Sequence, residues 1–189
     1  MRRFDPLPYG LALLALGLDI AALTFLSLSE LDVTIARARS AALGAMVIVT
    51  PALILYVLRR EPPGDWWRAF WTAGMLAYLA HFWWAVFVTY DGDFKAIAER
   101  QGFIAYTNFL VTLAWPIDVV LAWIRNPLSG GPFVVFRFLV WALVAVSFIA
   151  ASAVFRSGSA RTLGLALTAA LILAIAVRYL DFRRSDTHA

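Results

Sequence analysis

The sequence predicts an all-α polytopic membrane protein, a single domain over residues 1–189 with six transmembrane helices and one short helix at the outer membrane surface. Of its 189 residues, 62% are apolar and 15% are charged. Ordinary soluble domains have roughly 45–50% apolar and about 25% charged residues. A soluble domain of this size needs a polar shell around its core, which this composition is too poor in charge to supply. We therefore expect lipid to be its solvent.

Six apolar stretches are long enough to cross a hydrocarbon layer of about 30 Å, which takes about 20 helical residues. They are apolar on all sides, whereas the strands of a membrane barrel would be about ten residues long and would alternate in polarity. Glycine, proline and aspartate, which commonly end helices, fill the joints. The predicted spans are about 8–28, 40–58, 66–90, 103–124, 132–155 and 162–180.

Two of these elements need separate arguments. The first apolar stretch is longer than the 7–15 residues typical of the apolar part of a secretory signal, and it lacks a small-x-small cleavage pattern, so we interpret it as a span. In the connection between the third and fourth spans, Phe94, Ile97 and Ala98 recur at helical spacing. We expect a short interfacial helix there, capped by Asp93.

The basic residues lie mainly at the ends of the apolar stretches, where they indicate topology and headgroup contacts instead of nucleic-acid binding. If the N-terminus is inside, nine basic residues fall on the inner side and six on the outer side, with Arg137 left out as intramembrane. This bias predicts that both termini are cytoplasmic. The excess of arginine over lysine is typical of a GC-rich genome, and we expect a bacterial inner-membrane protein.

Asp118 and Arg137 are the first of the informative polar residues, because an ionisable side chain inside a span costs about 2.5–3.5 kcal/mol on insertion and usually faces a partner in the bundle. Asp118 lies six residues before the inner end of the fourth span, and Arg137 five residues into the fifth. Both depths are roughly 8–10 Å. We predict an ion pair or a water-bridged contact that clamps helix register; the alternative is a proton or anion site in which Arg137 holds the anion.

His81 is the only histidine inside the spans, near the outer third of the third one. Asn108 enters the fourth span at a similar depth, so the two could meet across the hairpin, with Tyr78, Thr24 and Thr107 as candidate neighbours. We interpret this group as a hydrogen-bonded core pair. The alternative is a contact to a ligand such as haem or a quinone.

Asp19 lies near the middle of the first span. It is expected to be protonated or bonded to a neighbouring helix, and a proton-relay role is the functional alternative. A conventional metal site is not expected, because the chain has no cysteine and a single core histidine, and because such sites need two or three ligands. No nucleotide-binding, hydrolase or metalloprotease motif is present either, so an enzyme is not the first interpretation.

One family comparison rests on a short segment of the second and third spans. The six-span arrangement, with Thr50-Pro51, Arg59-Arg60 and Gly74-x3-Tyr78-x2-His81, resembles the ferric-reductase-type haem membrane domain. That resemblance implies a haem b held by histidines on the third and fifth spans, with His81 as the first. The fifth span here has no histidine for the second position, which leaves Met46, Met75 or an exogenous ligand.

These observations lead to three expectations about function. The first is a non-catalytic accessory or assembly subunit whose partners are the lipid bilayer and other membrane-protein subunits. The second is a membrane redox protein that binds haem or a quinone near His81. The third is a small transporter that uses Asp19 or the pair formed by Asp118 and Arg137.

Overall fold

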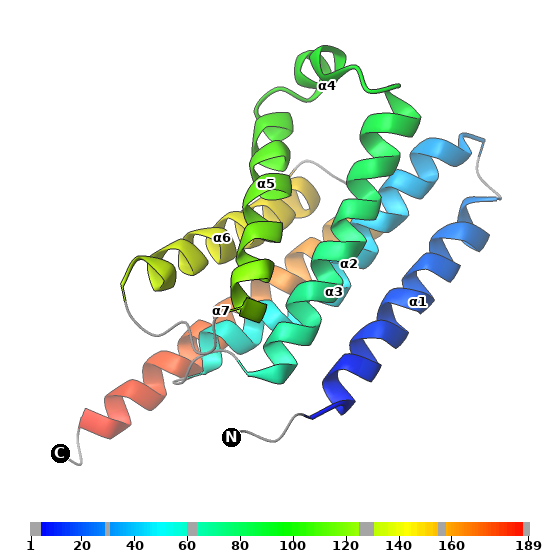
Figure 1. Ribbon diagram of the computed structural model, residues 1–189. Coiled ribbons are helices and arrows are strands. Elements are labelled where there is room, and N and C mark those ends of the chain that lie inside the picture. Colours follow the sequence, from blue (N-terminus) through cyan, green and yellow to red (C-terminus); the bar gives the residue numbers. More distant parts are fainter. Residues whose placement is uncertain (1–4, 29–30, 60–63, 125–130, 155–157, 187–189) are drawn as a thin grey trace.

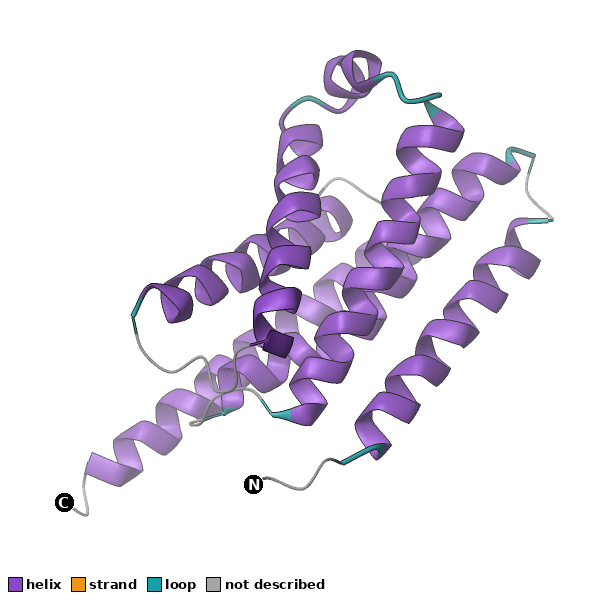
Figure 2. Cartoon of the chain, in the orientation of Figure 1, coloured by secondary structure: helices purple, strands orange, loops and turns teal. Residues whose placement is uncertain are grey.

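The fold is helical throughout the residues that the structure, a computed structural model, describes: 5–28, 31–59, 64–124, 131–154 and 158–186. No strand occurs among them (Figures 1 and 2), which confirms the predicted all-α class. Two helices continue into a π-helical segment, η1 and η2. The elements are α1 (Leu7–Ser27), α2 (Val33–Leu58), α3 (Asp65–Trp83), η1 (Trp84–Thr89), α4 (Phe94–Gln101), α5 (Phe103–Ile124), α6 (Pro132–Ile149), η2 (Ala150–Val154) and α7 (Ser159–Asp186).

Six of these elements are long and apolar enough to cross a membrane, so the predicted number of spans is confirmed. The third span combines α3 with η1, and the fifth combines α6 with η2. The start of α1 and the end of α7 lie at the same end of the molecule, opposite α4 (Figure 1). This is expected because an even number of antiparallel spans returns the chain to the side on which it began. The architecture is that of an all-α polytopic membrane protein.

The start of α2 differs from the prediction, because the helix begins at Val33 instead of near residue 40. Asp32 caps it: its Oδ1 atom accepts hydrogen bonds from the backbone amides of Thr34, at 3.0 Å, and Ile35, at 3.1 Å. The charge of Arg37 interrupts the apolar pattern, but its guanidinium lies 5.1 Å from the ring centroid of Trp84. The cap and this cation–π contact extend the helix beyond its apolar part.

The end of α7 also differs, since the helix continues to Asp186 instead of ending near residue 180. The predicted short helix between the third and fourth spans is present as α4. Asp93 Oδ1 accepts a hydrogen bond from the backbone amide of Ala96 at 2.9 Å, and Ile97 is buried. Gly102, at φ 56°, ends α4 in a backbone conformation that favours glycine, and α5 begins at the next residue.

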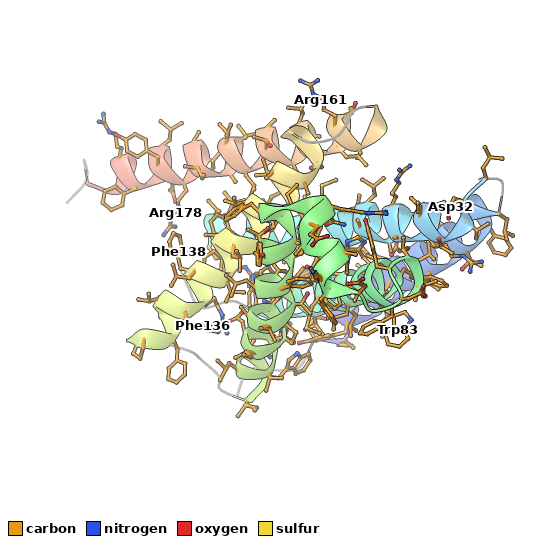
Figure 3. All side chains as sticks on the ribbon, turned by 90° about the horizontal axis from the view of Figure 1, so that it is seen from above. Asp32, Trp83, Phe136, Phe138, Arg161 and Arg178 are labelled. Carbon is orange, nitrogen blue, oxygen red and sulfur yellow. The ribbon has the colours of Figure 1, made fainter. Side chains whose placement is uncertain are left out.

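The centre of the bundle is α2, which packs against α1, α3, α6 and α7. It lies close to α3 at Gly74, where a Cβ atom would lie only 2.7 Å from Cβ of Val49. Small residues at such crossings let membrane helices pack tightly. The terminal helices lie at the periphery, and Figure 3 shows Arg161 of α7 pointing outward and Trp83 at the edge of the molecule. The largest fully buried side chains are Trp67, Trp71 and Trp115.

Candidate functional site

The buried ion pair between α5 and α6 is the centre of the candidate site. Arg137 Nε donates a hydrogen bond to Asp118 Oδ1 at 3.1 Å, and the two side chains are 6% and 1% exposed. The pairing predicted from equal depths is therefore present. It arises because α5 ends at Ile124 and α6 begins at Pro132, so that six residues on one helix and five on the next bring both side chains to one level.

Trp71 adds a third helix to this pair. Its indole Nε1 donates to Asp118 Oδ2 at 2.9 Å, so that both carboxylate oxygens accept a hydrogen bond from a donor on another helix. A buried charge is tolerated when it is paired and hydrogen-bonded in this way. Sequence analysis missed the contact, but a signal existed: Trp71 lies five residues into the predicted third span, which places it at the depth of Asp118.

An aromatic ring lies against the guanidinium of Arg137. Its Cζ atom lies 4.8 Å from the ring centroid of Trp67, which itself stacks on Trp71 at 5.3 Å. Three buried donors have no hydrogen-bond partner within the described part of the chain: Trp67 Nε1, Trp115 Nε1 and Arg137 Nη2. The cation–π contact with Trp67 offsets part of the free-energy cost of burying the charged guanidinium. Every polar group that touches Asp118 is a donor, and the cluster holds more donors than acceptors.

A second polar cluster joins α3 to α5. Tyr78 donates its phenolic hydrogen to the backbone carbonyl of Asn108 at 2.9 Å. Thr112 Oγ1 lies 2.8 Å from the same carbonyl and 3.3 Å from the Tyr78 hydroxyl. Tyr78 and Asn108 were expected to be neighbours, whereas Thr112 was missed. It lies four residues after Asn108, on the same face of the helix, and that spacing was the available signal.

His81 bonds to α2 instead of α5. Its Nδ1 atom lies 2.7 Å from the backbone carbonyl of Ala38, and because a carbonyl can only accept, Nδ1 carries the proton. The described residues include no hydrogen bond between His81 and Asn108, so the predicted contact across the hairpin is wrong. The physical reason is the early start of α2, which brings its first turns beside His81.

The other candidate neighbours of His81 are occupied within their own helices. Thr24 Oγ1 donates to the carbonyl of Ile20 at 2.7 Å, and Thr107 Oγ1 donates to that of Ile104 at 2.9 Å. This back-bonding satisfies a hydroxyl in an apolar environment without a partner helix. Neither residue joins His81 in a site.

The residues around His81 do not fit a haem held by two histidines. The fifth span has no histidine, and at the level of Tyr78 it presents Phe148, whose ring packs edge-on against the tyrosine at 6.1 Å. The Nδ1 proton of His81 is already donated to Ala38, so the neutral ring has no donor left for a quinone carbonyl. The described residues also contain no group of three or more His, Cys, Asp or Glu side chains that could hold a metal ion.

Asp19 lies in the seam between α1 and α2. Four residues of α1 at helical spacing from Asp19 are buried: Pro8, Ala12, Leu23 and Ser27. The carboxyl group packs against Gly44 of α2, so closely that an added Cβ atom would collide with Asp19 Oδ1. The predicted contact with a neighbouring helix is present, but none of the described residues donates a hydrogen bond to this carboxyl group.

Comparison with protein-family models, curated proteins and solved structures finds no match to this chain. The class of the protein, an all-α polytopic membrane protein, is therefore defined by its own helices. Its candidate site is the buried cluster of Asp118, Arg137 and Trp71.

Proposed function

We propose that the protein is a non-catalytic accessory or assembly subunit that contacts partner helices or lipids in the membrane. The observation that carries this proposal is the use of its intramembrane polar groups. Asp118, Arg137, Tyr78 and His81 all bond between helices of this chain, and so does Trp141, whose Nε1 donates to the carbonyl of Leu53 at 3.1 Å. Such contacts fix one arrangement of the bundle and leave its outer faces for recognition.

The outer face of α5 supports a contact with another helix. Its exposed large residues alternate in steps of three and four, which is the spacing of the seam between two packed helices. Exposure along this stripe ranges from 53% to 80%. The stripe consists of Phe103, Tyr106, Leu110, Leu113, Ile117, Val120 and Ile124.

Photo-crosslinking in native membranes tests this function. A benzophenone amino acid at Leu113, which is 67% exposed on α5, is compared with one at Leu173, which is 65% exposed on α7. We expect a discrete protein adduct from Leu113 and lipid adducts from Leu173. The crosslinked protein, identified by mass spectrometry, should also fall in abundance when this chain is deleted. Lipid adducts from both positions, with an unchanged membrane proteome, would contradict the accessory role.

A further inference from the structure

Asp19 is the intramembrane ionisable side chain that the accessory role does not use. It lies twelve residues after Leu7 and eight before Ser27, the ends of α1, which places it about 18 Å and 12 Å from them along the axis. This is the interior of the hydrocarbon layer, where an ionised carboxylate costs about 2.5–3.5 kcal/mol even on insertion scales. A compensating contact is therefore expected.

The seam with α2 supplies space but no donor. The Asp19 carboxyl group packs against Gly44. Gly44 lies inside α2 (Val33–Leu58), so its backbone amide already donates a hydrogen bond within the helix. A carboxylate without a donor in an apolar seam is strongly disfavoured, whereas a neutral carboxylic acid fits because it carries no charge.

The charged and titratable groups on the helices packed against α1 are engaged elsewhere. On α2, Arg37 bonds to Ser27 Oγ at 3.2 Å, about 12 Å along α1 from Asp19. The charge of Arg39, an exposed residue of α2, acts on Asp32, and Tyr56 stacks on Trp141. On α3, His81 bonds to Ala38, about 9 Å along α2 from Gly44. Also on α3, Asp65 accepts a hydrogen bond from Tyr9 and pairs with Arg68, about 15 Å away from Asp19 in the other direction. Tyr78, the last such group of α3, donates to the carbonyl of Asn108.

We propose that Asp19 is a proton-binding site in the membrane interior, which holds its proton while α1 packs on Gly44. The ligand is a proton, bound by a carboxyl group that is only partly buried in the seam, so that its remaining surface faces the lipid. The site is separate from the clamp at Asp118, whose oxygens accept hydrogen bonds from Arg137 and Trp71. It stands independently of the accessory role.

Dicyclohexylcarbodiimide tests this site, because this apolar reagent partitions into lipid and reacts with protonated carboxylic acids. The acid O–H adds across one C=N bond: the carboxyl oxygen bonds to carbon and the proton to nitrogen. An oxygen-to-nitrogen acyl shift then gives a stable N-acylurea. Nothing leaves, so the labelled peptide gains the full mass of the reagent. The full chain in liposomes is treated across roughly pH 5–9 and mapped by mass spectrometry.

We expect labelling at Asp19 that slows as the pH rises, with Asp118 at least tenfold less labelled. Asp19→Asn should abolish the modification. Gly44→Ala should change its rate several-fold by displacing the carboxyl group, whereas Gly17→Ala, with open space around it, should leave the rate unchanged. Absent labelling, or labelling that does not depend on pH, overturns the proposal if the infrared spectrum at neutral pH also lacks a protonated-carboxyl band that disappears in Asp19→Asn.

Discussion

Asp118 and Asp19 are both carboxyl groups inside membrane-spanning helices, but the regions that hold them differ in every contact. Asp118 lies among α3, α5 and α6, where Arg137 and Trp71 donate to its two oxygens. Asp19 lies between α1 and α2, against a glycine and without a donor from the described residues. In the first region the carboxylate is stabilised by an ion pair. In the second, on our proposal, the carboxyl group of Asp19 is protonated and carries no charge.

The largest expected effect comes from breaking the pair on one side. Asp118→Leu leaves Arg137 buried without its counter-charge, and we expect the free energy of unfolding in detergent micelles to fall by about 3–5 kcal/mol. The double variant Asp118→Leu/Arg137→Met removes both charges and should recover most of that loss. An equal loss in the single and double variants would show that the site contributes packing volume and no electrostatic clamp.

Trp71→Phe is expected to have the next largest effect, because it deletes the indole donor to Asp118. Trp115→Phe is the matched control, since its indole N–H has no partner among the described residues and both side chains are fully buried. We expect Trp71→Phe to cost about 1.5–3 kcal/mol more than the control, the range for a hydrogen bond to a charged group. Equal losses of unfolding free energy in urea for the two variants would show that the indole N–H of Trp71 does not stabilise the cluster.

The seam at Asp19 is tested by Gly44→Ala, whose new methyl group would collide with the carboxyl group. Overpacking of this kind typically costs about 1–3 kcal/mol. Adding Asp19→Ala should relieve the collision, and Gly17→Ala should cost nothing because no atom lies within 4 Å of its Cβ position. Thermal unfolding of these three variants and the unchanged protein distinguishes a specific contact from a general intolerance of α2 to larger residues.

Asp32 should show the smallest effect and provides a third case, a carboxylate outside the spans. The backbone amide of Ile35 and the side chain of Thr34 hold the pKa of Asp32 below its usual value. Its stabilisation of α2 is therefore present above the unfolded pKa of about 3.9 and is lost as the pH falls through the lower folded pKa. Hydrogen exchange in the first turn of α2 should become faster at low pH, and Asp32→Ala should abolish that dependence.

The sequence by itself determined the class of the protein, the number of spans and the pairing of Asp118 with Arg137. These are one-dimensional properties: the length of an apolar stretch sets a span, and the number of residues from its end sets the depth of a side chain. The cap at Asp93 was also visible, because a helix start depends on a few adjacent residues.

Tertiary structure decided which helix each polar side chain faces. Depth alone placed His81 near Asn108, but the early start of α2 gave it Ala38 as its partner, and the contact of Trp71 with Asp118 needed the packing of α3 on α5. The same is true of Asp19, whose seam exists only because Gly44 of α2 lies opposite it. Rotation about a helix axis and the choice of neighbouring helix depend on side-chain packing over the whole bundle, which no single stretch of sequence contains.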